Sequence, residues 1–168
     1  GILYKTVMPI RLEADWSGYK AYRRSTSGFV FSLGNRAISW SSKKQLTVAL
    51  SSTKAEYRGA AVAACEAVWL KRILKDLGEP IKDPTPLYCD NMSSIYLAQN
   101  PVFHTRTKHI EVHYHFICER VLAGDVDLQH INTNLQTADN FTKALGADKL
   151  WQFMTNLGLT IPDLPSLR

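Results

Sequence analysis

The stretch Leu87-Tyr88-Cys89-Asp90-Asn91 decides the fold, because it has the pattern of a short buried strand that ends in a carboxylate. A loop that carries three prolines, over residues 80–86, precedes the strand. A short helix is predicted over Ser93 to Gln99, and it ends before Pro101 because the residue before a proline disfavours the helical conformation. Asp90 is therefore expected at the edge of a sheet, where a strand gives way to a helix.

Three further acids, Glu13, Glu56 and Asp139, occupy comparable positions far from Asp90 in the sequence. Acids that end strands or open helices can converge at one sheet edge, and such a cluster is costly unless cations neutralise it. Mg²⁺ is the usual partner, because it prefers carboxylate oxygens and water as ligands. Two such ions about 3.5–4 Å apart can clamp the attacking and leaving oxygens of a phosphodiester. The pattern therefore suggests a nuclease.

The remaining elements are strands first and then strands alternating with helices. Alternating residues predict a first strand over Arg11–Trp16, with Glu13 and Asp15 on one face. A long amphipathic helix is expected over Thr53–Leu77, with Gly78 as its C-terminal cap. The other expected elements are a hairpin over Phe29–Leu33 and Ala37–Ser41, an extended piece over Thr47–Leu50, a helix over Thr107–Ala123, a strand over Val126–Ile131, and helices over Gln136–Ala144 and Ala147–Asn156. This order predicts an α/β fold with a mixed sheet flanked by helices.

Composition limits the function classes. The chain has 168 residues, of which 45% are hydrophobic, so we expect one domain over residues 1–160 and a tail over 161–168. There is no apolar run of roughly 20 residues and no signal-peptide pattern, which predicts an intracellular protein, cytoplasmic or nuclear. The first residue is not Met, which fits a piece of a larger polyprotein. Cys65, Cys89 and Cys118 lack metal-ligand spacing and are expected to be reduced, buried thiols. The net charge of +5 favours a polyanionic partner.

Several longer blocks carry a family resemblance. They run over Ala37–Gln45, Thr47–Thr53, Asn100–Ile110 and Ala138–Lys143. In order and spacing they resemble the ribonuclease H domain of copia-type LTR retrotransposon polyproteins, over about Gly1 to Leu159. The resemblance implies a five-stranded ribonuclease H-like sheet and hydrolysis of the RNA strand of RNA–DNA hybrids. It also implies two Mg²⁺ ions, with Mn²⁺ as a substitute, held by Glu13, Glu56, Asp90 and Asp139, and a reverse transcriptase upstream in the polyprotein.

Each acid also has a structural interpretation. Glu56 stands three residues after Thr53, the spacing of a helix capping box, and Asp90 could cap the helix that follows it. Asp139 could complement a helix dipole. Glu13 departs from the family, which has Asp at this position. Because Mg²⁺ tolerates little variation in ligand distance, the longer side chain could impair the site. Asp15 could replace Glu13 as a ligand, or the first ligand position could have decayed.

Basic and polar residues near these acids are candidates for nucleic-acid contacts. The candidates for phosphate contacts are Lys43, Lys44, Arg106, Lys108 and His109, and Asn91 and Ser93 could contact the 2′-hydroxyl that distinguishes RNA from DNA. Any of these charges could instead be solvated surface. The histidines His109, His113 and His115 give a much weaker zinc pattern, because no Glu or Cys pair supports them. The tryptophans Trp40, Trp69 and Trp151 are expected in the core.

Two other functions remain open. The domain could be catalytically impaired and act as a nucleic-acid-binding or interaction module, since fold and basic charge can persist without chemistry. An integrase-type nuclease of the same superfold is disfavoured, because four acids are spread along the chain instead of three.

Overall fold

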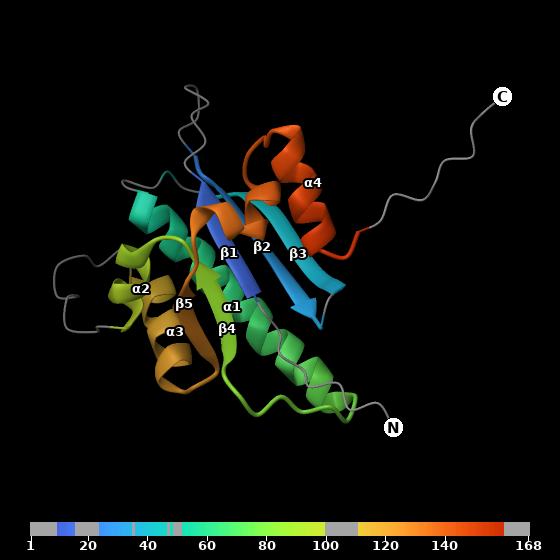
Figure 1. Ribbon diagram of the computed structural model, residues 1–168. Helices are drawn as coiled ribbons and strands as arrows, with labels where there is room; N and C mark the ends of the chain where they lie inside the picture. Colours follow the sequence, from blue (N-terminus) through green and yellow to red (C-terminus); the bar gives the residue numbers. More distant parts are fainter. Residues whose placement is uncertain are drawn as a thin grey trace.

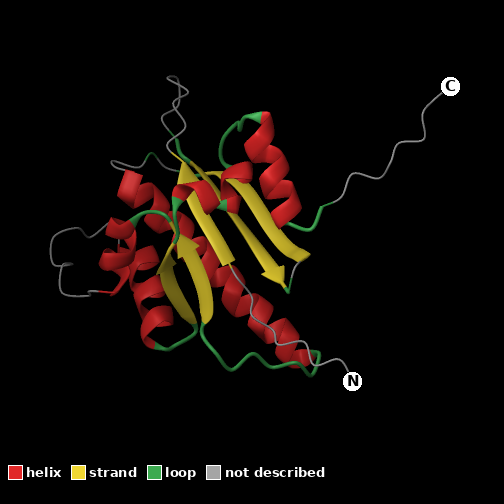
Figure 2. Ribbon diagram, in the orientation of Figure 1, coloured by secondary structure: helices red, strands yellow, loops and turns green. Residues whose placement is uncertain are grey.

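The computed structural model describes residues 10–15, 24–34, 36–46, 48, 52–99 and 111–159; within residues 10–15, 52–54 and 111–114 it describes the backbone alone. The described part folds as an α/β unit (Figures 1 and 2). Its strands are β1 (Ile10–Asp15), β2 (Thr26–Leu33), β3 (Arg36–Lys44), β4 (Thr85–Cys89) and β5 (Val126–His130). Its helices are α1 (Ser52–Asp76), α2 (Met92–Gln99), α3 (Glu111–Leu122) and α4 (Ala147–Asn156), with 3₁₀ turns η2 (Thr133–Leu135) and η3 (Thr137–Phe141).

The strands form one five-stranded mixed sheet in the order β3-β2-β1-β4-β5. β1, β2 and β3 are antiparallel neighbours, whereas β4 runs parallel to both β1 and β5. Because β1 and β4 are parallel, their carboxyl ends lie at the same edge of the sheet, and Leu12 pairs with Cys89 there. The mixed sheet and the flanking helices confirm the predicted fold class.

The core lies between the sheet and α1, with α2 and α3 packed beside α1. Phe29 and Phe31 of β2 face this layer and contact each other edge to face, with ring centroids 5.4 Å apart. The small residues Ala60, Ala63, Ala64 and Ala67 of α1 are buried in the same cluster, which lets the helix lie close to the strands. Gly78 follows α1 with a φ of +87°, the left-handed conformation expected of a C-terminal cap. Figure 1 shows α1 behind the sheet, with η3 and α4 in front.

The segment η2–η3 crosses the carboxyl edge of the sheet. The side chain of Gln136 donates from Nε2 to the carbonyl oxygen of Tyr88 in β4, at 3.3 Å. At the other end, the hydroxyl of Ser42 in β3 donates to the carbonyl oxygen of Phe141, at 2.5 Å. The close approach requires Gly28 in β2, because a Cβ built there would lie 2.7 Å from Thr142 Cγ2 and 2.8 Å from Phe141 Cβ. This segment therefore spans from β4 across to β2 and β3.

Several expectations from the sequence are wrong in detail. Trp40, Trp69 and Trp151 are exposed by 60%, 53% and 53%, because each lies on a strand or helix face that no other described element covers. Cys89 and Cys118 are buried, but Cys65 is exposed on the outer side of α1; all three are free thiols. The helix expected over Gln136–Ala144 is instead the short 3₁₀ turn η3.

Of the extended piece expected over Thr47–Leu50 only Val48 is described, and it is exposed, so that expectation stays a prediction. Residues 107–110 of the helix expected from Thr107 lie outside the described residues. No helix in the described part of the chain is both long and apolar enough to cross a membrane.

Candidate metal centre

The backbone of β1 brings Glu13 to the carboxyl edge of the sheet. Glu13 pairs with Gly28 of β2 on one side. On the other side, Leu12 pairs with Cys89, the last residue of β4. Glu13 follows Leu12 and therefore lies beside the point where the chain leaves β4. Asp15 ends β1 two residues later, opposite Thr26. The side chains of Glu13 and Asp15 lie outside what the structure describes, so the choice between them stays a prediction.

Glu56, Cys89 and Asp90 meet at this edge. One ligand atom from each of the three side chains lies within 4.8 Å of the other two. No other group of three metal-ligating side chains is this close together among the described residues. Glu56 comes from the second turn of α1, whereas Cys89 and Asp90 come from the end of β4. Two of the four predicted carboxylates are therefore together, although 34 positions separate them in the printed sequence.

The start of α1 is fixed by Gln45, which follows β3. Its Nε2 donates to the carbonyl oxygen of Ala55 at 2.6 Å and to the hydroxyl of Ser27 at 2.8 Å. Ala55 is fully buried. Because Glu56 is the next residue, these bonds set its position relative to the sheet. The expected capping box with Thr53 lies outside the described side chains.

Cys89 contributes a protonated thiol to the group. Burial raises its pKa to about 12; the hydrogen bond with the Asn91 backbone lowers the pKa, and the nearby carboxylates of Glu56 and Asp90 raise it. The Sγ–H lies 3.8 Å from Glu56 Oε2 and can donate to it, while the backbone N–H of Asn91 donates to Sγ at 3.4 Å. At neutral pH the thiol therefore acts as a weak donor that orients Glu56.

Thr133 orients the other carboxylate. Its hydroxyl donates to Asp90 Oδ2 at 2.8 Å, from η2, which follows β5 in the chain. The backbone N–H of Ile131 donates to the carbonyl oxygen of Cys89 at 3.0 Å, which holds the chain after β5 against the end of β4. Asp90 is thus positioned by a neighbouring strand end and not only by its own loop.

Asp139 lies in η3 with its side chain fully buried. Burial raises the pKa of this carboxyl, and the charges of Lys143 and Lys149 only partly offset the increase. Lys143 Nζ lies 2.9 Å from Oδ2, whereas Oδ1 has no hydrogen-bond partner among the described residues. Asp139 is therefore a costly buried acid that the partly exposed Lys143 and the charge of Lys149 neutralise only in part.

Asp139 does not belong to the group of Glu56, Cys89 and Asp90. Its segment nevertheless crosses the same edge, because Gln136 bonds to β4 and Thr142 packs on Gly28 of β2. η3 contacts β1, the strand between those two. The backbone therefore brings all four predicted acids to one edge of the sheet, while the described side chains join only Glu56 and Asp90.

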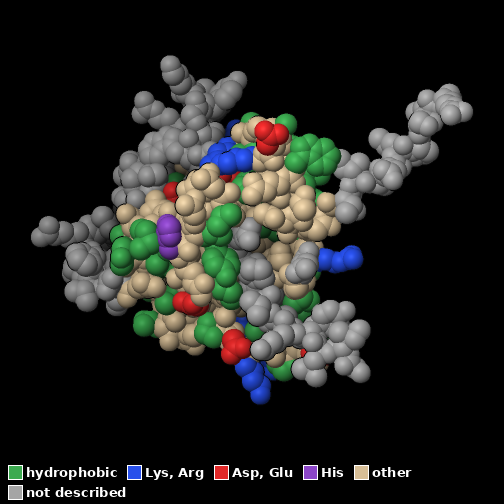
Figure 3. All heavy atoms as spheres, in the orientation of Figure 1, with side chains coloured by type: hydrophobic (Ala, Val, Ile, Leu, Met, Phe, Trp, Pro, Cys, Tyr) green, Lys and Arg blue, Asp and Glu red, His purple; other side chains and the backbone are tan. Residues whose placement is uncertain are grey.

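The described basic candidates lie beside this edge. Lys43 and Lys44 are exposed at the end of β3, where Lys44 pairs with Thr26 and Thr26 pairs with Asp15. Two strand spacings, about 10 Å, separate that backbone from β1. Figure 3 shows Lys and Arg side chains as separate groups on one face, with no continuous basic stripe there.

Asn91, which is predicted to contact the 2′-hydroxyl, also caps helix α2. Its Oδ1 accepts from the backbone N–H of Ser94 at 3.0 Å and caps α2, so the amide nitrogen is the group that can face a ligand. Ser93 is exposed in the first turn. Arg106, Lys108 and His109 lie outside the described residues, and of His113 in α3 only the backbone is described. His115 is exposed on α3 and does not join a metal-ligating group among the described residues.

Sequence reasoning missed three residues of the site. Cys89 stands directly before the predicted ligand Asp90. Lys143 stands four residues after the predicted ligand Asp139, and this spacing could have indicated an i, i+4 ion pair. Thr133 gave no signal, because its contact with Asp90 depends on how β5 pairs with β4.

Comparison with known proteins identifies relatives of this chain. It is 44% identical over 148 residues to the "Retrovirus-related Pol polyprotein from transposon RE1" of Arabidopsis thaliana, which covers 88% of the chain and 10% of the relative. It is 43% identical over 137 residues to the corresponding polyprotein from transposon TNT 1-94 of Nicotiana tabacum, covering 82% of the chain and 10% of the relative. The chain thus spans about a tenth of the curated relatives it matches. No family model matches it.

Solved structures with the same fold are ribonuclease H domains. The amino-terminal RNase H domain of a Mycobacterium tuberculosis protein superposes with a TM-score of 0.56 at 14% identity, covering 88% of this chain and 96% of that one. LC11-RNase H1, solved in complex with an RNA/DNA hybrid, gives a TM-score of 0.58 at 12% identity, covering 80% of this chain and 93% of that one. By sequence and fold together, the chain belongs to the ribonuclease H domains of retrovirus-related Pol polyproteins from copia-type transposons.

Proposed function

We propose that this domain is a metal-dependent endonuclease that hydrolyses the RNA strand of RNA–DNA hybrids. The observation that carries the proposal is the meeting of Glu56 and Asp90 at the carboxyl end of β4, beside the backbone of Glu13. Membership of the ribonuclease H domains supports a nuclease in general. The hybrid substrate follows from the family resemblance, and neighbours such as LC11-RNase H1 were solved with an RNA/DNA hybrid.

The residues present fit divalent metal ions. Glu56 and Asp90 offer hard oxygen ligands close together, and Asp139 offers a buried carboxylate whose Oδ1 has no hydrogen-bond partner among the described residues. A buried acid with a raised pKa is also typical of functional sites. Glu13, Glu56, Asp90 and Asp139 would hold two Mg²⁺ ions, with Mn²⁺ as a substitute. When bound, such ions activate a water molecule and stabilise the leaving 3′-oxygen.

The protein's own groups would position the reactants. Thr133 and Cys89 hold the carboxylates of Asp90 and Glu56 by hydrogen bonds, which limits their rotation when a metal binds. Lys43 and Lys44 would contact phosphates of the substrate near the cleavage point. The amide nitrogen of Asn91 and the hydroxyl of Ser93 would contact the 2′-hydroxyl. Arg106, Lys108 and His109 complete the proposed nucleic-acid contacts.

The proposal also covers the parent polyprotein and the place where it acts. The curated relatives are Pol polyproteins about ten times longer than the matched segment, so we infer that a reverse transcriptase precedes this domain in its parent protein. The protein would then act inside the cell, in a retrotransposon particle in the cytoplasm or in the nucleus.

A second function, a nucleic-acid-binding module without catalysis, is favoured by two observations. Glu replaces the family Asp at residue 13. In addition, Lys143 forms an ion pair with Asp139, and that contact would have to yield or shift for Asp139 to bind a metal. Both features would weaken metal binding while leaving the fold intact.

Cleavage of a hybrid labelled on its RNA strand separates these functions. The wild-type chain should cut the RNA strand with Mg²⁺ or Mn²⁺ and leave 5′-phosphate and 3′-hydroxyl ends. Glu56→Gln and Asp90→Asn should abolish cutting while hybrid binding in EDTA remains. Hybrid binding without cutting in either metal would favour the binding module, and cutting that survives both substitutions would reject the proposed site.

A further inference from the structure

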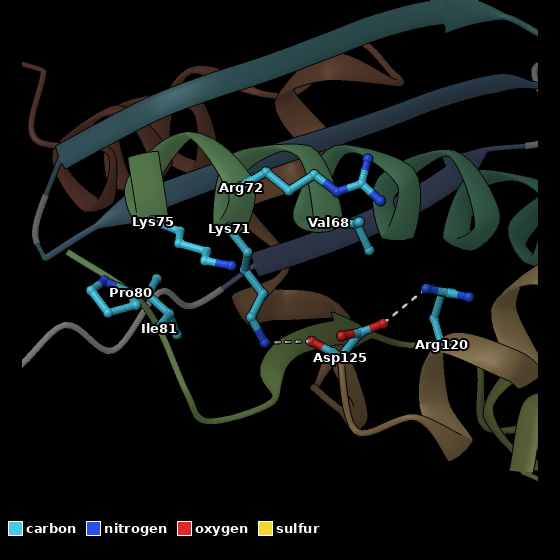
Figure 4. Close-up of a pocket in the computed structure, with 8 residues that line it drawn as sticks. All are labelled: Val68, Lys71, Arg72, Lys75, Pro80, Ile81, Arg120 and Asp125. Atoms are coloured by element: carbon cyan, nitrogen blue, oxygen red, sulfur yellow. Dashed lines mark hydrogen bonds and ion pairs between the residues drawn. The ribbon is translucent and has the colours of Figure 1, made fainter. Parts of the chain in front are cut away.

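A basic pocket lies towards the end of α1 that is remote from the acidic group. Its volume is about 260 Å³, and four of its lining residues are cations: Lys71, Arg72, Lys75 and Arg120. The single acid in the lining is Asp125. Figure 4 shows the first three cations on α1, Arg120 on α3, and Asp125 on the turn that precedes β5. Glu56 and Arg72 are 16 positions apart in the printed sequence, about 24 Å along the helix axis, so this pocket is separate from the proposed catalytic site.

The α1 cations share one stripe of the helix. Lys71, Arg72 and Lys75 follow the i, i+1, i+4 spacing, and the pocket residue Val68 lies three positions before Lys71. Like charges four residues apart oppose helix formation by about 0.2–0.5 kcal/mol. The dipole of the helix C-terminus favours Lys75, but it falls off within the last turn and does not explain Arg72.

Neighbouring groups neutralise only part of this charge. Lys71 donates to two backbone carbonyls, of Asp83 at 3.0 Å and of Asp125 at 3.3 Å, which are neutral acceptors. The carboxylate of Asp125 is engaged by Arg120, with Nη1 3.1 Å from Oδ2. Among the described residues, neither Arg72 nor Lys75 has an ion-pair partner. The pocket therefore carries an excess of positive charge.

Arg120 is held in place before any ligand arrives. Its guanidinium carbon lies 5.4 Å from the centre of the Phe116 ring, and its Nη1 is fixed by Asp125. Its Nε is buried and has no hydrogen-bond acceptor among the described residues. A preformed cation loses little freedom on binding, which favours recognition of an anion.

We propose that this pocket binds phosphate groups, in the form of a polyphosphate chain. Two guanidinium groups and two ammonium groups suit an anion with several oxygens, because Arg binds phosphate through two parallel hydrogen bonds and Lys binds it as a point charge. Pro80 and Ile81 form an apolar wall beside the cations, where a group attached to the phosphate can lie. The phosphate can come from a free nucleotide or from the backbone of a nucleic acid.

Titration calorimetry with pyrophosphate tests the site. The 168-residue chain is titrated in EDTA at low salt, so that the proposed metal centre cannot bind pyrophosphate through an ion. Arg72→Glu and Lys75→Glu should each raise the dissociation constant at least about tenfold. Arg36→Glu is the matched control, because it changes the net charge equally at an exposed residue that does not line the pocket, and it should stay within about twofold. Thermal melting checks that all three variants fold.

Two results would overturn the proposal: no pyrophosphate binding by the wild-type chain at millimolar concentration, or equal weakening by Arg36→Glu. Competition then identifies the source of the phosphate. If saturating pyrophosphate displaces a labelled hybrid and Arg72→Glu weakens hybrid binding, the pocket binds the nucleic-acid backbone. If hybrid binding is unchanged while pyrophosphate binding is lost in Arg72→Glu, the pocket binds a free polyphosphate.

Discussion

Lys143 Nζ lies 2.9 Å from Oδ2 of Asp139, four residues earlier in the chain, and the Asp139 carboxylate has no solvent exposure. The lysine side chain is one-third exposed, so it keeps part of its hydration while the acid has lost nearly all of its own. This asymmetry explains why burial dominates and the pKa of Asp139 is raised. It also makes Asp139 a residue that reduces the stability of the folded, metal-free domain at neutral pH.

Replacing Asp139 should therefore stabilise the metal-free protein at neutral pH. Because the folded-state pKa is raised above the ordinary value of 3.8, the acid favours folding at low pH, and this contribution is lost as pH rises through the raised pKa. Asp139→Asn should raise the free energy of unfolding by about 1 kcal/mol at pH 7 and by much less near pH 3.5. Urea unfolding in EDTA at both pH values measures this difference. A stabilisation of equal size at both pH values would contradict the argument.

Magnesium should reverse the order of stability. Wild type should gain stability with Mg²⁺ concentration, because an ion that binds only the folded state adds RT ln(1 + [L]/Kd). Asp139→Asn should gain much less, and its cleavage rate should fall to background. Melting temperatures measured across a magnesium titration compare the two proteins.

Thr133→Val should weaken the metal site without unfolding the domain. The substitution removes the hydroxyl that donates to Asp90 Oδ2 at 2.8 Å, at an exposed residue. Loss of a group that orients a metal ligand typically costs about 10–100-fold in metal affinity or activity. The Mg²⁺ concentration for half-maximal cleavage should therefore rise, whereas Thr133→Ser, which keeps a hydroxyl, should behave like wild type. Equal effects of the two substitutions would show that the hydrogen bond is not what matters.

Gly28→Ala should separate η3 from the sheet. A Cβ at residue 28 would lie 2.7 Å from Thr142 Cγ2 and 2.8 Å from Phe141 Cβ, so the segment that carries Asp139 must move. We expect a loss of about 1–3 kcal/mol in unfolding free energy, the usual cost of overpacking, and a fall in cleavage. Gly146→Ala is the control, because nothing lies within 4 Å of a Cβ there, and it should cost under about 1 kcal/mol.

Glu13→Asp should raise the cleavage rate in Mg²⁺. The shorter side chain restores the ligand of the family pattern, and a displacement of about 1 Å can cost on the order of a hundredfold in rate. Wild type should favour Mn²⁺ over Mg²⁺ more strongly than the variant does, since Mg²⁺ demands near-ideal geometry. Single-turnover cleavage in each metal measures both effects. Equal rates in Mg²⁺ would mean that the site has adapted to Glu, and Asp15→Ala tests whether Asp15 has taken over.

Hybrid binding should depend on salt through Lys43 and Lys44. Each phosphate contact releases counterions, so the slope of log affinity against log salt should fall by about 0.9 in magnitude for each lysine changed to Gln. Arg36→Gln, at the other end of β3, should leave the slope unchanged. A slope that is the same in all variants would remove Lys43 and Lys44 from the interface.

The sequence was a good guide wherever local pattern determines structure. The long helix, its Gly78 cap and the β2–β3 hairpin follow from periodicity and turn residues, and they appear close to their predicted bounds. Local pattern could not show which faces remain uncovered, which is why the exposed Trp40 was expected in the core. A tryptophan on an alternating strand looks the same in sequence whether or not a helix packs over it.

In the candidate site, too, local sequence predicted some features, whereas others depend on contacts between distant parts of the chain. The positions of Glu56 and Asp90 followed from strand and helix ends, because parallel strands place their carboxyl ends at one edge. The roles of Thr133 and Gln136 could not be predicted in this way. Thr133 bonds to Asp90 and Gln136 bonds to Tyr88, and these partners are distant in the sequence. The ion pair of Lys143 with Asp139 is local in sequence, but its importance depends on burial that the sequence does not reveal.

The crossing of η2–η3 over the sheet edge has a consequence for how the domain is made. Residues 133–142 supply the hydroxyl that holds Asp90 and the carbonyl that binds Ser42, a contact between positions 99 residues apart. During synthesis on the ribosome, β1 to β5 can emerge and pair before this segment exists, but the edge that carries the acids stays incomplete. Contacts between distant parts of a chain form late because loop closure must come first. The proposed metal centre would therefore be complete only after nearly the whole domain has left the ribosome, and truncation before residue 142 should leave a sheet without that site.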